Sequence, residues 1–303
     1  MTRGTAARGR RQRPANARAA ADGMKLHRRV LRLDGRDHTV IGLRPGTAAR
    51  FSTNLFHGTW HVLSDGHGAR LLGRLLWGLA YQARPGTLIV IDRPFLTSTP
   101  FDADPADPIV LVPGWATPFG PDAAGDLKAR LPLASAPDGT VRWRTHGLDR
   151  ALDDIRAWFE ADSPYWSPDR GGVERLRGLI VVRPQDRVTA RTWAVLSGRM
   201  HAPRRHSRHA YLGPWNHGHT GEIQIFPDFR RKVSLARLAR AQVLEGLRLE
   251  ETQTPGLTLD ALWAMDGALS GTDPRELPAG RRNELLGELR RVKGRLVRRG
   301  RRR

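Results

Sequence analysis

The chain has 303 residues, of which 51 are lysine or arginine and 30 are aspartate or glutamate, so its formal charge at neutral pH is +21. Cysteine is absent, which excludes disulfides, thiolate nucleophiles and cysteine-ligated zinc or iron–sulfur sites. Apolar residues make up 39% of the sequence, enough for the core of an α/β domain. No segment is long and apolar enough for a transmembrane helix, and we therefore expect a cytoplasmic protein.

The positive charge is concentrated at the two ends of the sequence. Residues 1–23 carry a net charge of +5 and residues 281–303 a net charge of +9, which leaves +7 for everything between them. Apart from the initial methionine, residues 1–23 contain no large apolar side chain, so they are predicted to form a disordered, arginine-rich tail. The sequence thus predicts a mildly basic α/β domain at 24–250 with strongly cationic extensions.

The first predicted element of this domain is a β-hairpin. Two stretches rich in apolar residues, 30–33 and 38–43, flank the sequence Asp-Gly-Arg-Asp at 34–37. An Asp-Gly pair favours a tight turn between antiparallel strands, because it accepts positive φ angles.

A helix and a buried strand follow the hairpin. Ser64 is predicted to cap a helix that starts near Asp65, and leucines at helical spacing continue it toward the Arg-Pro-Gly sequence at 84–86. The all-apolar stretch at 88–91 is typical of a strand that is buried on both faces of a sheet. A helix, a turn and a buried strand in this order indicate an α/β fold.

The rest of the sequence continues this alternation. Residues 97–140 are rich in proline, aspartate, alanine and glycine and are predicted to wrap around the surface or to cover a site. The further expected elements are strands at 109–112, 179–182 and 222–226 and helices at 148–159, 187–199, 229–249, 257–268 and 282–299. We therefore predict an α/β fold in which a mixed β-sheet is flanked by helices and is followed by a helical, highly basic C-terminal extension at 251–303.

The predicted helix at 282–299 gives the clearest indication of function. A narrow apolar stripe runs along it, and arginines crowd the rest of its surface. Like charges at helical spacing destabilise an isolated helix, so we expect an anionic partner to order it. The arginines expected to contact that partner are Arg290, Arg291, Arg295, Arg298 and Arg299. The helix at 229–249 repeats the pattern, and the alternative for both is that the apolar stripe docks on the domain while the charge is only solvated.

A stretch rich in histidine and arginine lies at 201–219. Its candidates for phosphate contact are Arg204, Arg205 and Arg208, and its candidates for a metal site are His217 and His219 with a neighbouring carboxylate. The spacing matches no metal motif, and the arginines would repel a cation, so phosphate contact is the stronger interpretation. A solvated loop without a ligand is the alternative.

The start of the helix near Asp65 is a further candidate anion site. Free N–H groups and the helix dipole attract anions at such a position. His67, Arg70 and Arg74 lie on one face of this helix, opposite the leucines. The sequence lacks the Gly-Lys-Ser/Thr ending of a P-loop, and an ordinary charged helix face is the alternative.

Asp92 closes the buried strand at 88–91, where open α/β sheets place catalytic and cofactor-binding groups. Asp102, Asp104 and Asp107 come soon after it and could gather a divalent cation with it. Two of these aspartates precede prolines, however, which is ordinary turn chemistry.

His57 and His61, on either side of Trp60, are a separate pair. A general base is conceivable there, but packing near aromatic rings is the commoner role.

Three functions remain open on these observations. The first is a nucleic-acid-associated protein that contacts the phosphates of DNA or RNA with little sequence specificity. The second is an α/β enzyme acting on an anionic, phosphorylated substrate, with or without a metal, at a site that combines Asp92, His67 and Arg70 with His217 and His219. The third is a scaffold whose cationic helix binds an acidic protein. No sequence motif identifies a cofactor.

Overall fold

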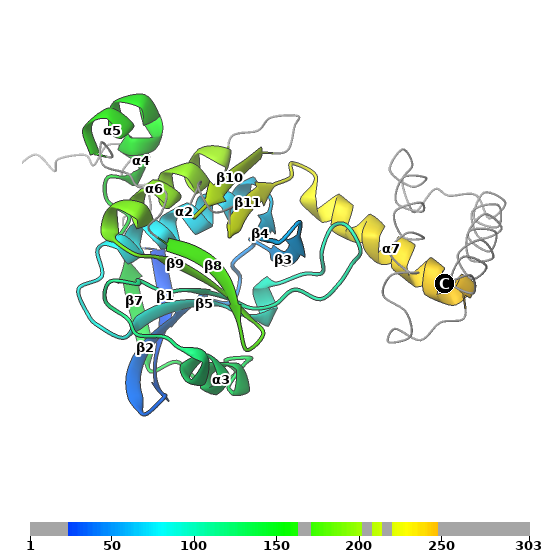
Figure 1. Ribbon diagram of the computed structural model, residues 1–303, viewed down its shortest axis with the longest axis horizontal. Coiled ribbons are helices and arrows are strands. Elements are labelled where there is room, and N and C mark those ends of the chain that lie inside the picture. The colour runs from blue at the N-terminus through cyan, green and yellow to red at the C-terminus, as the bar shows by residue number, and fades with distance from the viewer. Residues whose placement is uncertain (1–23, 163–170, 202–207, 214–219, 248–303) are drawn as a thin grey trace, which may run out of the picture.

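The computed structural model describes residues 24–162, 171–201, 208–213 and 220–247. Two mixed β-sheets, of seven and four strands, are flanked by helices (Figure 1), which confirms the predicted α/β fold. The predicted tail at 1–23 and the predicted helical extension at 251–303 lie outside the described residues. None of the helices in the described part combines the length and the apolar character needed to cross a bilayer.

The larger sheet has the strand order β7-β1-β2-β5-β6-β9-β8. The β2–β5 and β6–β9 pairs are parallel, and the other pairs are antiparallel, which makes the sheet mixed. Its strands are β1 (Met24–Leu33), β2 (Arg36–Gly42), β5 (Thr87–Ile91), β6 (Ile109–Leu111), β7 (Gly139–Trp143), β8 (Gly171–Leu176) and β9 (Leu179–Pro184).

The predicted hairpin is the β1–β2 pair. Its turn consists of Asp34 and Gly35, whose φ angles are 48° and 69°, and β2 begins directly after it. Positive φ at both central positions is the conformation that an Asp-Gly pair accepts and that matches the twist of the flanking strands.

Helices cover both faces of the larger sheet. Helix α3 (Pro121–Ala129) packs on one face, and α2 (Gly66–Ala80) and α6 (Arg187–Gly198) pack on the other (Figure 1). In β5, Leu88 and Val90 belong to the core under α3, whereas Ile89 and Ile91 belong to the core under α2 and α6. Burial on both faces explains why this strand is an uninterrupted apolar run.

Close packing of α2 depends on small residues. A side-chain carbon at Gly73 would lie 2.8 Å from the carbonyl oxygen of Ala194 in α6, and one at Gly78 would clash with the indole of Trp143. The indole N–H of Trp143 donates to the carbonyl of Leu75 at 3.2 Å, which fixes the ring against the helix. Glycine is therefore required where α2 meets α6 and β7.

Two expectations about helix ends need correction. Asp65, not Ser64, caps α2: its carboxylate accepts from the amide of Gly68 at 2.9 Å, while Ser64 is the last residue of strand β4. The helix expected at 148–159 is divided into α4 (Leu148–Asp153) and α5 (Ile155–Asp162). The division has a local cause, because the side chain of Asp154 accepts from the amide of Ala157 at 3.0 Å and starts a new helix.

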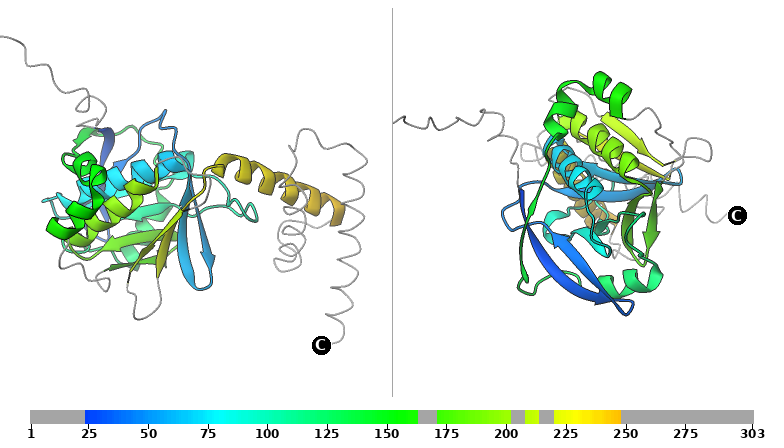
Figure 2. Two further views of the ribbon diagram at one scale, coloured as in Figure 1. Left: turned by 90° about the horizontal axis from the view of Figure 1, so that it is seen from above. Right: turned by 90° about the vertical axis from the view of Figure 1, so that its left-hand side faces the viewer.

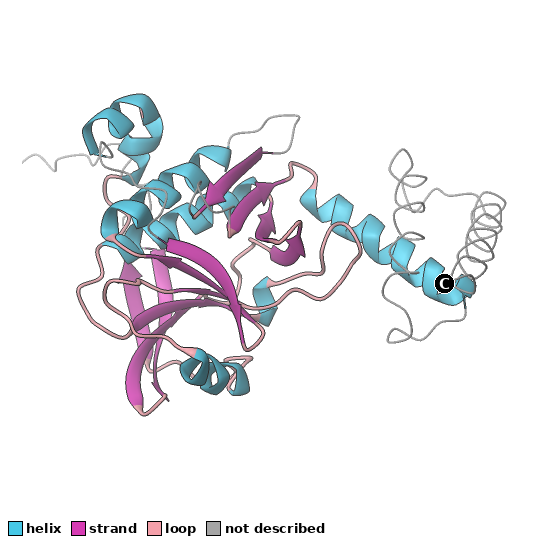
Figure 3. Cartoon of the chain, viewed as in Figure 1, coloured by secondary structure: helices cyan, strands magenta, loops and turns pink. Residues whose placement is uncertain are grey.

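The smaller sheet, of strand order β10-β11-β4-β3, was predicted only at β11. Its strands are β3 (Phe51–Phe56), β4 (Thr59–Ser64), β10 (Arg208–Leu212) and β11 (Gly221–Ile225) (Figure 3). Val62 and Ile223 on one face join the core of α2 and α6. The side chains that alternate with them point to the opposite face, away from those helices.

Helix α7 (Phe229–Leu247) starts beside this sheet and extends away from both sheets (Figures 1 and 2). Phe229 and Val233 anchor its first turns against Leu63 of β4. Two short 3-10 turns, Arg93–Phe95 and Arg199–His201, complete the elements of the described residues.

Three arginines of α7, which the sequence placed on a cationic face of the helix, donate hydrogen bonds to the domain. Arg230 donates to the carbonyl of Ala48, Arg237 to the hydroxyls of Thr97 and Ser98, and Arg240 to Asp104 at 2.7 Å. These arginines attach the helix to the domain, because each one faces an acceptor that the domain provides.

Candidate functional site

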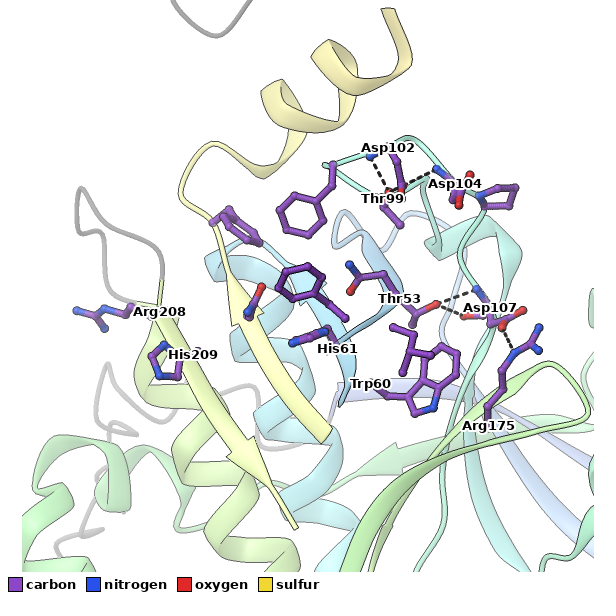
Figure 4. A pocket seen from close by; sticks show the side chains of 17 residues that line it. Thr53, Trp60, His61, Thr99, Asp102, Asp104, Asp107, Arg175, Arg208 and His209 are labelled. Atoms are coloured by element: carbon purple, nitrogen blue, oxygen red, sulfur yellow. Dashed lines mark hydrogen bonds and ion pairs between the residues drawn. The ribbon is translucent and has the colours of Figure 1, made fainter. Parts of the chain in front are cut away.

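A cavity of about 730 Å³ lies against the β3 edge of the smaller sheet (Figure 4). We call it the sheet-edge cavity. Its walls come from β3, β4 and β11, from the loop at 99–107, from Arg175 of β8 and from the start of β10. Figure 4 shows Arg208 and His209 at one side of it and Asp107 and Arg175 at the other. Its volume is in the range typical of small-molecule sites.

The strand register brings a row of polar residues to this cavity. Asn54 of β3 lies opposite His61 of β4, and His61 lies opposite Glu222 of β11. Directly opposed residues point to the same face of a sheet, so this row lies on the face away from α2 and α6. The segments that supply it are far apart in the sequence.

His61 and Glu222 form a buried pair. His61 Nε2 lies 3.2 Å from the Glu222 carboxylate, and the two side chains are only 5% and 10% exposed. Gln224 Nε2 donates to the other carboxylate oxygen of Glu222 at 2.9 Å. Burial alone would raise the pKa of Glu222, but the hydrogen bonds from His61 and Gln224 and the nearby imidazoles outweigh it, so the pKa lies below its ordinary value.

The ionised carboxylate of Glu222 fixes the orientation of the His61 ring. It accepts the hydrogen bond from Nε2–H, so Nδ1 is left with its lone pair when the ring is neutral. His61 Nδ1 and Asn54 Oδ1 are both buried, and neither has a hydrogen-bond partner within the described part of the chain. Two such atoms on directly opposed residues that line one cavity are unusual, since almost all buried polar atoms are hydrogen-bonded.

Aromatic side chains form much of the remaining wall. Phe101 and Phe226 meet edge to face, with ring centroids 5.8 Å apart, and the guanidinium of Arg175 lies 6.0 Å from the ring of Trp60. Phe56 lies with its ring centroid 6.3 Å from that of His61 and is 49% exposed. The cavity therefore combines flat apolar surfaces with a small polar base.

The three aspartates at the rim of the sheet-edge cavity have separate partners. Asp102 accepts from the hydroxyl of Thr99, Asp104 pairs with Arg240, and Asp107 pairs with Arg175 at 2.7 Å. They do not gather with Asp92, and no group of three or more histidine and carboxylate side chains among the described residues is placed to hold a metal ion. The described residues therefore do not form the divalent-cation site in which the sequence placed these aspartates together with Asp92.

Asp92 lies at a second cavity, of about 600 Å³, which we call the strand-end cavity. Its side chain is buried, and its two oxygens accept from the amides of Arg93 and Leu133, each at 2.6 Å. Buried Arg29 lines the same cavity and donates to the carbonyls of Leu133 and Ser135. Asp92 thus holds the 133–135 segment against the sheet.

The start of α2 already holds an anionic group of the protein. The carboxylate of Asp65 occupies the helix N-terminus, and Arg230 lies 3.7 Å from it. His67 is exposed, and Arg70 lies 3.8 Å from Asp149. Burial and the charge of Arg70 lower the pKa of Arg74 from its high ordinary value. The side chains predicted to bind an anion at this helix do not line either cavity; they are His67, Arg70 and Arg74.

Several of the predicted contact residues lie outside the described residues. They are Arg204, Arg205, His217, His219, Arg290, Arg291, Arg295, Arg298 and Arg299. Arg208 is described: it starts β10, lines the sheet-edge cavity and donates to the carbonyl of Arg199 at 3.0 Å. Among the described residues predicted to bind an anion, Arg208 lines the sheet-edge cavity, whereas Arg70 and Arg74 line neither of the two cavities above.

Comparison with known proteins adds no relative to this picture, because no family model, no curated protein and no solved structure matches the chain. The function of the chain is therefore inferred from its own residues.

Sequence reasoning had noted His61 but not its partners. A signal for the β3–β4 hairpin was present, since residues 51–56 and 59–64 are rich in aromatic and β-branched side chains and flank a His-Gly pair. In the structure His57 and Gly58 have φ angles of 49° and 77° and form that turn. The pairing of β4 with β11 joins segments about 160 residues apart, as the separation of His61 and Glu222 shows, and no local pattern encodes it.

Proposed function

We propose that the protein associates with nucleic acid, through phosphate contacts of low sequence specificity, in the cytoplasm. The observation that carries the proposal is the distribution of charge: residues 1–23 and 281–303 together hold +14 of the net charge of +21. Cations that neutralise phosphates release counterions, which gives affinity without base recognition. The absence of cysteine suits a reducing compartment.

The arginines of the described domain make it a poorer source of phosphate contacts than these ends. Arg175, Arg183 and Arg240 pair with carboxylates, and Arg29 and Arg50 donate to main-chain carbonyls. A cation that already has a protein acceptor contributes less to counterion release than one in a segment with few acidic residues. We therefore assign the phosphate contacts mainly to the C-terminal arginines named above, followed by Arg204, Arg205 and Arg208.

The test compares two full-length variants that lose the same charge. In the first, Arg290, Arg291, Arg295, Arg298 and Arg299 are changed to glutamine; in the second, the exposed domain residues Arg36, Arg44, Arg84, Arg142 and Arg144 are changed in the same way. Anisotropy of labelled single-stranded and duplex DNA gives the affinity at several salt concentrations. We expect the first variant to bind about 100-fold more weakly and with a shallower salt dependence, and the second to lose much less.

Equal losses in the two variants, or no binding by the wild type at low salt, would contradict the proposal. Poly-glutamate provides a further control. If it competes as well as DNA of equal charge, the cationic ends recognise acidic protein, as in the scaffold interpretation.

An enzyme acting on an anionic substrate is the second candidate, and the His61–Glu222 pair favours it. A carboxylate that orients a histidine whose other nitrogen has no partner within the described part of the chain is the arrangement of a general base. Asp92 is less suited to this role because both of its oxygens accept main-chain amides. A hydrolytic activity on phosphate esters that His61→Gln abolishes, and that the C-terminal arginine variant retains, would establish this candidate.

A further inference from the structure

We propose that the sheet-edge cavity binds one unpaired nucleobase that carries an exocyclic amino group, such as cytosine or adenine. The inference rests on the proposed association with nucleic acid and adds a base-recognising subsite to it. Its basis is the combination of aromatic walls with two buried acceptors on directly opposed residues, Asn54 Oδ1 and His61 Nδ1, that have no partner among the described residues.

A ligand that satisfies these two acceptors must supply N–H donors. Glu222 holds the Nε2–H of His61, so the neutral ring presents an acceptor at Nδ1, and Asn54 presents a second acceptor from the adjacent strand. An amino group has two hydrogens and can donate to both atoms. Thymine and uracil have a carbonyl in the place where cytosine has its amino group, and their single N3–H can satisfy only one of the two acceptors.

The walls of the cavity suit a flat ring. Phe56, Phe101 and Phe226 line the cavity together with Asn54 and His61, and stacking on aromatic side chains is the usual way in which proteins hold unpaired bases. Phe56 is the most accessible of them: its side chain is 49% exposed and its ring lies beside that of His61. Because the two acceptors are buried, binding of a base requires side chains beside them, such as this exposed ring, to turn aside.

The charges around the cavity indicate where the phosphates lie. Asp102, Asp104 and Asp107 are on the side of the 99–107 loop, whereas Arg208 and His209 are on the side of β10 (Figure 4). Asp104 and Asp107 are paired with Arg240 and Arg175, so the loop side is close to neutral and carries the additional carboxylate of Asp102. A phosphate is attracted by Arg208, so we place the sugar–phosphate chain on the β10 side of the cavity.

The test uses the full chain and three single strands of the same length: oligocytidylate, oligothymidylate and an abasic strand. Cytosine and thymine have similar size, so the first two differ mainly in the amino group. We expect oligocytidylate to bind about tenfold more tightly than oligothymidylate, as one well-formed hydrogen-bonded contact to a base provides. The abasic strand should bind most weakly, because it cannot stack.

Three variants locate the effect. Asn54→Leu should abolish the preference for cytosine over thymine, and Phe56→Ala should reduce the advantage of both base-containing strands over the abasic strand to less than about threefold. Tyr81→Ala is the matched control, since Tyr81 is also an exposed aromatic residue, at 57%, and does not line the cavity. It should behave as the wild type. Circular dichroism of each variant confirms that it is folded.

The outcomes separate the inference from the function on which it rests. Equal binding of the three strands by the wild type overturns the subsite and leaves phosphate association standing. A cytosine preference that Asn54→Leu and Phe56→Ala do not change also overturns the subsite, because the bases are then read elsewhere. If no strand binds at low salt, the proposed association itself fails.

Discussion

The sheet-edge cavity and the strand-end cavity have similar volumes but use their polar groups differently. In the strand-end cavity both oxygens of Asp92 accept main-chain amides, and Arg29 donates twice to main-chain carbonyls. In the sheet-edge cavity Asn54 Oδ1 and His61 Nδ1 have no acceptor or donor opposite them among the described residues. The first arrangement stabilises the fold, whereas the second leaves hydrogen-bonding capacity for a ligand.

This difference shows why a polar residue at the end of a strand is not sufficient grounds for a catalytic role. Asp92 occupies the position that the sheet topology favours for chemistry, yet its charge is used locally. His61 is in the middle of a strand and acquires its setting from β3 and β11. If the distinction holds, substitutions of polar groups that have partners in the fold, such as Asp92, change stability, and substitutions of Asn54 and His61 at the sheet-edge cavity change binding.

The largest effect is expected for Asp92→Ala. The change removes a buried carboxylate and leaves the amides of Arg93 and Leu133 without their acceptors, so the free energy of unfolding should fall by about 3 kcal/mol. Urea denaturation measures the loss. Asp149→Ala, which removes a half-exposed carboxylate 3.8 Å from Arg70, is the control and should cost less than about 1 kcal/mol. The affinity for oligocytidylate should be unchanged in both variants. An Asp92→Ala protein that is as stable as the wild type but does not bind would contradict the structural role of Asp92.

Substitutions at two neighbouring residues of β3, Thr53 and Asn54, should change the free energy of unfolding in opposite directions. The hydroxyl of Thr53 accepts from the amide of Asp107 at 2.8 Å, so Thr53→Val should lower the free energy of unfolding by about 1–2 kcal/mol. Asn54→Leu replaces an acceptor that has no partner, and it should leave stability unchanged or raise it by up to about 1 kcal/mol. Both are measured by thermal and urea denaturation. A destabilised Asn54→Leu would indicate that its amide is used in the fold.

A smaller effect concerns acid stability. Because the folded-state pKa of Glu222 lies below its ordinary value of 4.5, its ionised form stabilises the fold fully above pH 4.5, and this contribution is lost as the pH falls below that value toward the folded-state pKa. Glu222→Gln should therefore show a weaker decrease in the free energy of unfolding on acidification than the wild type. Gln224→Leu removes one hydrogen bond to the carboxylate, so the folded-state pKa of Glu222 should lie closer to 4.5 and the decrease should be smaller than in the wild type. Equal acid profiles for all three proteins would contradict this account of the pair.

The smallest expected effect is on the affinity for oligocytidylate when Arg208, on the β10 side of the cavity, is substituted. Arg208→Gln removes one cation, so it should weaken the binding of oligocytidylate about threefold and reduce the salt dependence by about one unit of slope. The preference for cytosine over thymine should persist, since Arg208 is assigned to phosphate and not to the base. Loss of that preference in the anisotropy titrations would place Arg208 in the base-recognising part instead.

Local patterns in the sequence were enough to predict much of the larger sheet. The Asp-Gly turn, the apolar run of β5 and the leucines of α2 each depend on residues close together in the chain, and the structure confirms them. The split between α4 and α5 was not predicted, because the capping side chain of Asp154 competes with an otherwise continuous apolar stripe.

The sheet-edge cavity could not be predicted in the same way. Its polar row depends on the register of three strands, two of which are separated by most of the domain. His61 alone is an ordinary histidine beside aromatic residues; what distinguishes it is the carboxylate of Glu222 on one nitrogen and the missing partner on the other. Neither property is visible until the strands are paired.

The most direct measurement is photochemical cross-linking of the full chain to an oligocytidylate that carries 5-iodocytosine, followed by mass spectrometry of the attached peptides. The account predicts attachment at the aromatic wall of the sheet-edge cavity, within 51–64, 97–107 or 220–226, and loss of this attachment in Phe56→Ala. Cross-links confined to other parts of the chain, with none in these segments, would contradict it.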